Sequence, residues 1–295
     1  MRRVLLLGSG GGLGRECEQA LLAAGFSVAC APHELCDISD SGDVKSLFEG
    51  TAPDIAVNAA AYTNVDGAED ERGKAFAVNA TGAGNIASEC AARSIALIHI
   101  STDYVFASPR NAPHSEAEIP HALCAYGESK LEGERLVARS GCRHFIIRTC
   151  GLFGRHRPGF PGAILRKLRQ GGAVPVIADH KVCPTPSRAL AQAVAVIAKA
   201  ELSGAEKPDG AYHFAGSPDT TWYDFALEVA SRARALGLCG GSAEIRPAAA
   251  ADFPQKAVRP EDSRLSCARI QKVFGISQPS WKDYIDETLQ GTSLG

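Results

Sequence analysis

The feature that most constrains the fold is a glycine-rich turn between a short apolar run and a helical pattern near the start of the chain. The apolar run covers Val4–Leu7, and Leu13–Ala24 has helical periodicity and ends at Gly25. Glycine lets a backbone turn sharply and approach a pyrophosphate closely, and the N-terminus of the following helix faces the negative charge. This strand–turn–helix context predicts a dinucleotide site, and the residues expected to hold the cofactor there are Gly8, Gly11, Gly12, Leu13 and Gly14.

Short apolar runs and helical patterns go on alternating through the first half of the chain. The expected strands are Val4–Leu7, Phe26–Cys30, Ile55–Ala59, Ala96–Ile100 and His144–Arg148, and the expected helices after the first lie around Val44–Phe48, Gly73–Arg93 and Tyr126–Ala138. This alternation is typical of βαβ units, so the predicted fold class is α/β, with a Rossmann-type doubly wound parallel sheet.

After Thr149 the pattern becomes less regular, which predicts a smaller, loop-rich domain. Helices are expected at Ala163–Gln170, Ser187–Ala200, Trp222–Leu236 and Ser266–Phe274, with N-caps at Ser187 and Thr221 and a stop at Gly275. Short strands are expected at Val174–Ile177 and Ala211–Phe214, and the Ala/Gly-rich stretch from Gly237 to Ala251 is interpreted as a linker. We therefore expect a dinucleotide-binding domain over residues 1–150. Residues 151–295 are expected to be mainly substrate-binding, with segments that return to the sheet.

Composition excludes several classes of function. Among 295 residues, 31 are Lys or Arg and 33 are Asp or Glu, so no positive field favours nucleic acid. No apolar run reaches the length of a membrane span, and the few apolar residues after Met1-Arg2-Arg3 are too short for a signal peptide. The ten cysteines form no CxxC pair and no metal-ligand spacing, so we expect reduced core thiols, no metal and a cytoplasmic location.

The segment after the second expected strand bears on the choice of cofactor. A carboxylate about 20 residues beyond the glycines would bind the ribose 2′-hydroxyl of NAD, but Cys30-Ala31-Pro32-His33 offers none. NADP(H) is therefore permitted alongside NAD(H), and the choice between them stays open. Asp37 and Ile38 are expected near the adenine, although Asp37 also fits a carboxylate that caps a turn.

A tyrosine and a lysine four residues apart form the main catalytic pattern. Tyr126 and Lys130 lie on one face of an expected helix, and Thr102 follows an apolar strand. An ammonium beside a phenol lowers the pKa of that phenol, which makes Tyr126 a candidate proton donor or acceptor. A hydroxyl at the C-terminal end of a strand points into the crevice where such sheets bind ligands, which suits Thr102.

Together these motifs resemble those of extended short-chain dehydrogenases/reductases and, within that group, the dTDP-4-dehydrorhamnose reductases. The resemblance runs over nearly the whole chain. Its more specific carriers are the STDYVF sequence at residues 101–106 and the RPEDSRL sequence at residues 259–265, and the others include Asn58–Asp66, Val78–Ala80, Cys183–Thr185 and Thr221–Ala226.

The resemblance implies NAD(P)H-dependent reduction of the C4 ketone of a nucleotide-linked 4-keto-6-deoxy sugar, in deoxysugar or polysaccharide biosynthesis. Tyr126 would protonate the forming alkoxide, Lys130 would assist Tyr126 and bind the nicotinamide ribose, and Thr102 would hydrogen-bond the substrate oxygen. The positions implied for the cofactor also include Ala60, Ala61 and Tyr62, and those implied for the substrate are Thr63, Val65, Thr102, Asp103 and Tyr104. Asn79 matches an asparagine that supports the scaffold of the site.

Two positions depart from the family pattern. Gly151 stands where the family often has a tryptophan against the sugar, so the sugar contact must differ. Some members dimerise around Mg²⁺ held by glutamates. Glu16 matches one of these, but Arg188 replaces another, which argues against a Mg²⁺-bridged dimer and leaves a homodimer open.

Two other functions stay open. A sugar-nucleotide epimerase or 4,6-dehydratase shares the superfamily, although a dehydratase needs a carboxylate pair and this chain has Tyr104 after Asp103. A non-catalytic, NADP-binding subunit similar to the regulatory subunit of methionine adenosyltransferase also resembles this family.

Overall fold

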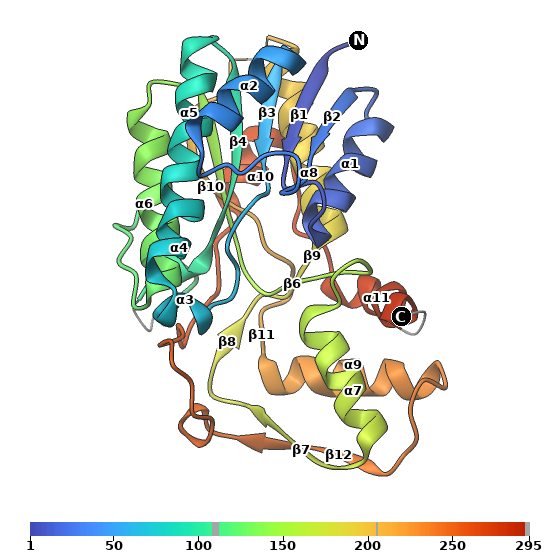
Figure 1. Cartoon of the computed structure of the whole chain (residues 1–295). Helices are drawn as coiled ribbons and strands as arrows, with labels where there is room; N and C mark the ends of the chain where they lie inside the picture. Colours follow the sequence, from blue (N-terminus) through green and yellow to red (C-terminus); the bar gives the residue numbers. More distant parts are fainter. Residues whose placement is uncertain (108–111, 205, 293–295) are drawn as a thin grey trace.

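The computed structural model describes residues 1–107, 112–204 and 206–292 (Figure 1). Its larger part is built on a six-stranded sheet in the order β10-β5-β4-β3-β1-β2, with every neighbouring pair parallel. The strands are β1 (Arg3–Leu7), β2 (Ser27–Ala31), β3 (Ile55–Asn58), β4 (Ala96–Thr102), β5 (His144–Thr149) and β10 (Gly210–His213). The α/β doubly wound prediction is confirmed, and the sixth strand comes from the second half of the chain.

Helices cover both faces of this sheet. On one face lie α1 (Gly12–Ala23), α8 (Ser187–Leu202) and α10 (Ala268–Phe274), and on the other lie α2 (Ser41–Thr51), α5 (Ala83–Ala92) and α6 (Ala125–Arg139). Alternate residues of β1 enter the two cores, Val4 with Leu6 on the first face and Leu5 with Leu7 on the second. Burial on both faces explains why this strand is an unbroken apolar run.

A smaller part lies below the sheet in the view of Figure 1. Its core is formed by α7 (Gly159–Gln170), α9 (Trp222–Ala235), α11 (Ile285–Thr292) and the parallel pair β7 (Gly172–Ile177) and β12 (Ala243–Ala248). Two short pairs connect it to the larger part, β6 (Leu152–Phe153) with β9 (Thr185–Pro186) and β8 (Lys181–Val182) with β11 (Thr220–Thr221). Short helical turns complete the fold at α3 (Gly67–Asp70), α4 (Arg72–Phe76), η1 (Ala77–Gly82), η2 (Asp103–Val105), η3 (Ala250–Asp252) and η4 (Trp281–Tyr284).

The structure corrects two local predictions and confirms two others. The stretch read as a linker contains β12, which pairs with β7 over six residues, so this part of it is a strand. Ser187 is the first residue of α8, whose N-cap is Pro186. Thr221 does cap α9, since its hydroxyl accepts a 3.0 Å hydrogen bond from the Asp224 amide, and Gly275 ends α10 with a left-handed φ of 70°.

The cysteines are placed as expected of core thiols. All ten are free, and eight of them are buried. Among the described residues, no helix combines the length and apolar character needed to cross a bilayer.

Candidate active site

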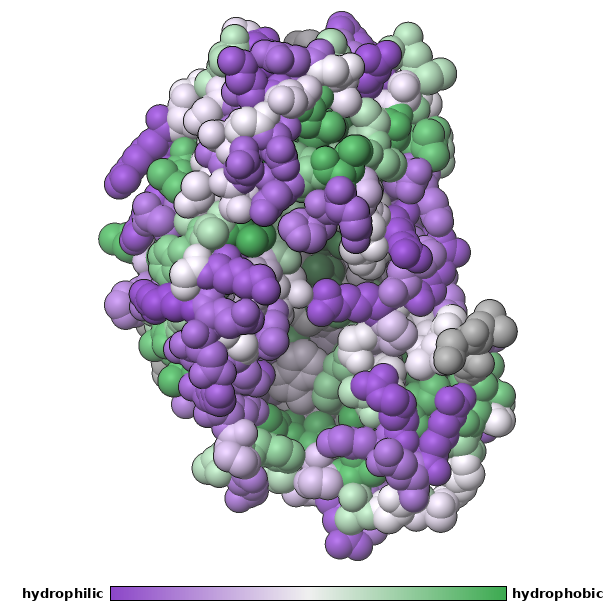
Figure 2. All heavy atoms as spheres, viewed as in Figure 1, coloured by the Kyte–Doolittle hydropathy of each residue, from purple (hydrophilic) through white to green (hydrophobic). Residues whose placement is uncertain are grey.

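A cavity of about 960 Å³ runs along the C-terminal ends of the central strands, and Figure 2 shows the molecule hollowed there, between its larger and smaller parts. The order of the strands reverses between β1 and β3, which is where open parallel sheets bind ligands. The structure brings every predicted site residue to this cavity: Gly8, Gly11, Gly12, Leu13, Gly14, Asp37, Ile38, Ala60, Ala61, Tyr62, Thr63, Val65, Thr102, Asp103, Tyr104, Tyr126 and Lys130.

The glycine turn forms one end of the cavity, and its tight packing explains why it needs glycine. Gly8 has a φ of 77°, and a Cβ atom there would lie 2.5 Å from the Ala60 nitrogen. A Cβ atom on Gly14 would lie 2.2 Å from the Gly8 carbonyl oxygen. The backbone of Ala59 and Ala60, directly after β3, therefore passes against the turn. This bare backbone beside the start of α1, whose N-cap is Gly11, fits the pyrophosphate of a dinucleotide.

The hydrogen bonds of Asp37 are those of a carboxylate that caps a turn, which was the alternative interpretation of this residue. Its carboxylate accepts from the Ser39 amide at 2.9 Å and from the Ser39 hydroxyl at 2.7 Å, and these bonds lower its pKa. The residue nonetheless lines the same end of the cavity as Ile38.

A π-helical turn within the expected helix Gly73–Arg93 helps to shape the cavity wall. This turn, η1, contains the buried Asn79, whose amide contacts two elements. Its Oδ1 accepts from the Tyr62 amide at 2.9 Å, and its Nδ2 donates to the Tyr62 carbonyl and to Ser129 Oγ, both at 3.0 Å. The side chain thus fixes the chain after β3 to α6, in the supporting position that the resemblance implies.

Lys130 follows Tyr126 by one turn of α6 and is almost fully buried. Its Nζ donates to the Ile100 carbonyl at 2.7 Å. Burial lowers the pKa of Lys130 to about 8, although the Glu134 carboxylate acts in the opposite direction. The ammonium is therefore close to its titration point near neutral pH.

The pKa of Tyr126 differs from the expectation that the neighbouring ammonium lowers it. Burial raises this pKa above its usual value, and this effect exceeds the lowering by a hydrogen bond with Thr102 and by the charge of Arg157. Tyr126 therefore keeps its proton at neutral pH, which suits a group that donates a proton during reduction.

Thr102 and Asp103 form a hydrogen-bonded pair at the end of β4. The Thr102 hydroxyl donates to Asp103 Oδ1 at 3.0 Å and accepts from the Tyr104 amide at 3.2 Å. Burial raises the pKa of Asp103 to about 6, against hydrogen bonds from Ser263 and Thr102 that lower it. The Tyr104 ring meets the Tyr126 ring edge to face, with centroids 5.3 Å apart.

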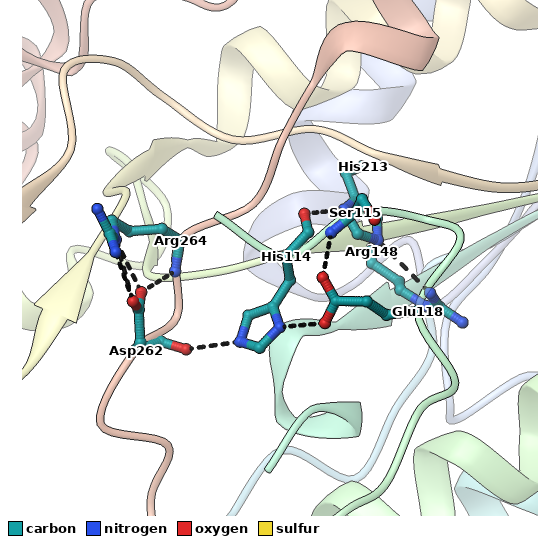
Figure 3. Close-up of polar contacts among 7 residues, drawn as sticks. All are labelled: His114, Ser115, Glu118, Arg148, His213, Asp262 and Arg264. Carbon is teal, nitrogen blue, oxygen red and sulfur yellow. Dashed lines mark hydrogen bonds and ion pairs between the residues drawn. The ribbon is translucent and has the colours of Figure 1, made fainter. Parts of the chain in front are cut away.

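Ser263, which hydrogen-bonds Asp103, belongs to a segment held by a buried polar network. Figure 3 shows this network around His114, Asp262 and Arg264. Ser263 stands between Asp262 and Arg264, whose side chains form an ion pair with a closest approach of 2.6 Å. His114 bonds the Asp262 carbonyl at 3.1 Å through Nε2 and Glu118 at 2.8 Å through Nδ1.

The same network continues to the sheet. His213 Nδ1 bonds the His114 carbonyl at 3.1 Å, and His213 Nε2 lies 3.5 Å from Arg148 NH1. The Arg148 guanidinium pairs with the buried Glu134, which also accepts from Ser101 Oγ at 2.5 Å. The catalytic candidates therefore lie against a buried, internally hydrogen-bonded support.

Sequence reasoning missed part of the cavity wall and a second cavity. Cys150 and Leu152 follow β5 and line the first cavity, and their place after a central parallel strand was the available signal. The second cavity, of about 410 Å³, shares Asp103, Tyr104 and Gly151 with the first. Its other walls include Phe160, Lys167, Trp222, Phe253 and Arg259, which come from separate parts of the chain and carry no joint sequence signal.

Among the described residues, no group of three histidine, cysteine or acidic side chains is close enough to bind a metal ion. Glu16, which matches a Mg²⁺ ligand of some family members, is buried and lies 3.2 Å from Arg155 Nε. Arg188 pairs with Glu287 at 3.1 Å.

Comparison with known proteins agrees with this geometry. The family model described as the RmlD substrate binding domain matches residues 1–293. A dTDP-4-dehydrorhamnose reductase of Aggregatibacter actinomycetemcomitans is 35% identical over 283 residues, covering 96% of each chain.

Two solved structures are similar over nearly their whole length. The dTDP-4-dehydrorhamnose reductase of Clostridium acetobutylicum has a TM-score of 0.88 at 28% identity, with 98% of both chains covered. The reductase of the same name from Bacillus anthracis, solved with NADP, also has a TM-score of 0.88 at 28% identity, covering 98% of this chain and 99% of its own. These relatives confirm the prediction of an oxidoreductase with a nicotinamide cofactor.

Proposed function

Since the chain belongs to the RmlD substrate-binding domain family, we propose that it reduces the C4 ketone of a dTDP-linked 4-keto-6-deoxy sugar with NADPH or NADH. The observation that carries this proposal is the meeting of Thr102, Tyr126 and Lys130 in one cavity, which the glycine turn also lines and which shares three lining residues with a second cavity.

The two cavities suit the two ligands of such a reaction. The larger one accommodates a dinucleotide from the glycine turn to Tyr126. The smaller one combines the aromatic walls Phe160, Trp222 and Phe253 with the cations Lys167 and Arg259, which suits a nucleobase and a diphosphate. Asp103, Tyr104 and Gly151 line both cavities, so the sugar would lie at this junction. Gly151 adds no side chain there, which leaves the sugar to be contacted by other groups.

Each of the three residues has a separate role in the reduction. A bound reduced nicotinamide supplies hydride to the ketone carbon. The Tyr126 hydroxyl gives its proton to the ketone oxygen, so that carbonyl and hydride yield a secondary alcohol and Tyr126 is left as phenolate. Thr102 orients the ketone oxygen through its hydroxyl. The Lys130 ammonium lies one turn along α6 from Tyr126 and stabilises that phenolate until it is reprotonated from solvent.

The direct test is oxidation of NADPH and of NADH with a panel of dTDP-, GDP- and UDP-linked 4-ketosugars. We expect stoichiometric cofactor oxidation with the dTDP-linked 4-keto-6-deoxy sugar. Turnover with a GDP- or UDP-linked sugar alone would contradict the proposed nucleotide. Cofactor that co-purifies and is not consumed would indicate an epimerase, and no turnover together with co-purification of an adenosyltransferase would indicate a regulatory subunit.

Removing the proposed proton donor tests the mechanism separately. We expect Tyr126→Phe to lower kcat by about 10²–10⁴-fold with NADPH affinity nearly unchanged. Tyr223→Phe is the matched control, because Tyr223 lies on α9 and lines neither cavity. A Tyr126→Phe variant that turns over at the normal rate would refute the assigned role.

A further inference from the structure

Arg157 lies beside the glycine turn, although it belongs to a loop more than 140 residues along the chain. It closes a tight loop in which the amides and carbonyls of Gly154 and Arg157 bond each other at 3.2 Å in both directions. Arg157 lines the larger cavity. A Cβ atom on Gly12 would lie 2.5 Å from the Arg157 Cβ, so the loop approaches α1 only because position 12 has no side chain.

The tip of this loop is fastened to α1 by a buried acid. Glu16 is 3% exposed, and its Oε1 lies 3.2 Å from Arg155 Nε and 3.7 Å from His156 Nε2. Arg155 also bonds Gln19 on the next turn of α1. Arg155 and His156, at the tip of the loop, are held by these contacts, whereas Arg157 lines the cavity.

The Arg157 guanidinium extends across the cavity from the glycine turn. Its NH1 donates to Thr63 Oγ1 at 3.2 Å, a single bond from an exposed arginine to a neutral hydroxyl. The other strong cations of the cavity are engaged elsewhere, since Lys130 bonds the Ile100 carbonyl at 2.7 Å and Lys74 lies 3.5 Å from Glu71. The Arg157 side chain therefore runs from Gly12, in the first turn of α1, to Thr63, and no carboxylate of the described residues forms an ion pair with it.

We propose that Arg157 binds the pyrophosphate of the dinucleotide, exchanging its bond to Thr63 for charge-assisted bonds to phosphate oxygens. The planar guanidinium suits this, since it presents paired donors to phosphate. The pyrophosphate is then held both by the backbone of the glycine turn and by a cation from the loop that packs against that turn. This inference rests on the dinucleotide role of the cavity and is independent of which sugar is reduced.

The test measures cofactor binding in the absence of sugar, by NADPH fluorescence titration of the Arg157→Gln variant. We expect the dissociation constant for NADPH to rise about tenfold or more, with a smaller rise for Arg157→Lys. The loss should shrink as salt is added, because the groove is open to solvent. Arg166→Gln is the control, since exposed Arg166 on α7 lines neither cavity and its removal changes the net charge equally.

Two fragments of the cofactor identify the group that is bound. 2′-Phospho-ADP-ribose contains the pyrophosphate, whereas 2′-AMP does not. We expect Arg157→Gln to weaken the first by the same factor as NADPH and to leave the second unchanged, each measured by competition. Unchanged binding of NADPH, or an equal loss for both fragments, would overturn the proposal. Failure to reduce any sugar would bear on the proposed substrate and not on this site.

Discussion

Lys130 offers a prediction in which stability and activity change in opposite directions. Burial lowers the pKa of Lys130 from 10.5 to about 8, so holding the ammonium in the folded protein below pH 8 costs about 3 kcal/mol. Lys130→Met removes this cost but leaves the Ile100 carbonyl without its donor, a loss of about 1 kcal/mol. At pH 7 the variant should therefore be more stable by about 2 kcal/mol and nearly inactive.

The pH dependence of this difference gives the sharper test. Between pH 8 and 10.5 the unfolded wild-type chain keeps the Lys130 proton while the folded chain releases it, so wild-type stability rises with pH relative to the variant. The free energy of unfolding, from urea titrations at several pH values, should favour the variant at pH 7 and lose that advantage by about pH 10. Taking the difference cancels other titrating groups, and Lys45→Met, at an exposed lysine of α2, controls for the loss of a lysine. A variant that is less stable at pH 7, by an amount that does not change with pH, would refute the reasoning.

Three further outcomes are expected. The kcat/KM for reduction should fall above about pH 8, as Lys130 loses the proton that stabilises the Tyr126 phenolate, and a flat pH–rate profile to pH 9.5 would contradict this. Gly14→Val should abolish NADPH binding in fluorescence titration, because a Cβ atom there would lie 2.2 Å from the Gly8 carbonyl oxygen. Thr221→Ala should lower the free energy of unfolding by about 1 kcal/mol through loss of the α9 cap, measured by urea denaturation, whereas Thr221→Ser should retain most of it.

The parts of the fold and site that could be predicted are those determined by residues close together in the sequence. The turn from Gly8 to Gly14 and the four-residue spacing of Tyr126 and Lys130 place their groups within a single turn or helix, so position along the chain predicts position in space. The alternation of apolar runs likewise predicts the parallel sheet, because strands buried on both faces are continuous apolar segments.

What sequence reasoning missed depends on contacts between distant segments. The Ala/Gly-rich segment containing β12 has no strong strand signal, and it becomes a strand only because β7 pairs with it. The raised pKa of Tyr126 follows from its burial in the folded chain. The spacing of Tyr126 and Lys130 in the sequence does not predict this burial. The second cavity takes walls such as Lys167 and Arg259 from α7 and from the segment before α10, so only the folded chain brings them together.

The sixth strand of the sheet has a consequence for how the chain is made. β5 ends at Thr149, but its outer neighbour β10 begins at Gly210, and α8, which covers one face beside α1, lies between them. During synthesis, the outer edge of β5 has no hydrogen-bonded neighbour until about sixty more residues have been made. Strands with an unpaired edge readily pair with other chains. A fragment that stops at residue 150 would retain this open edge permanently, and we expect it to aggregate even though every glycine of the dinucleotide turn is present.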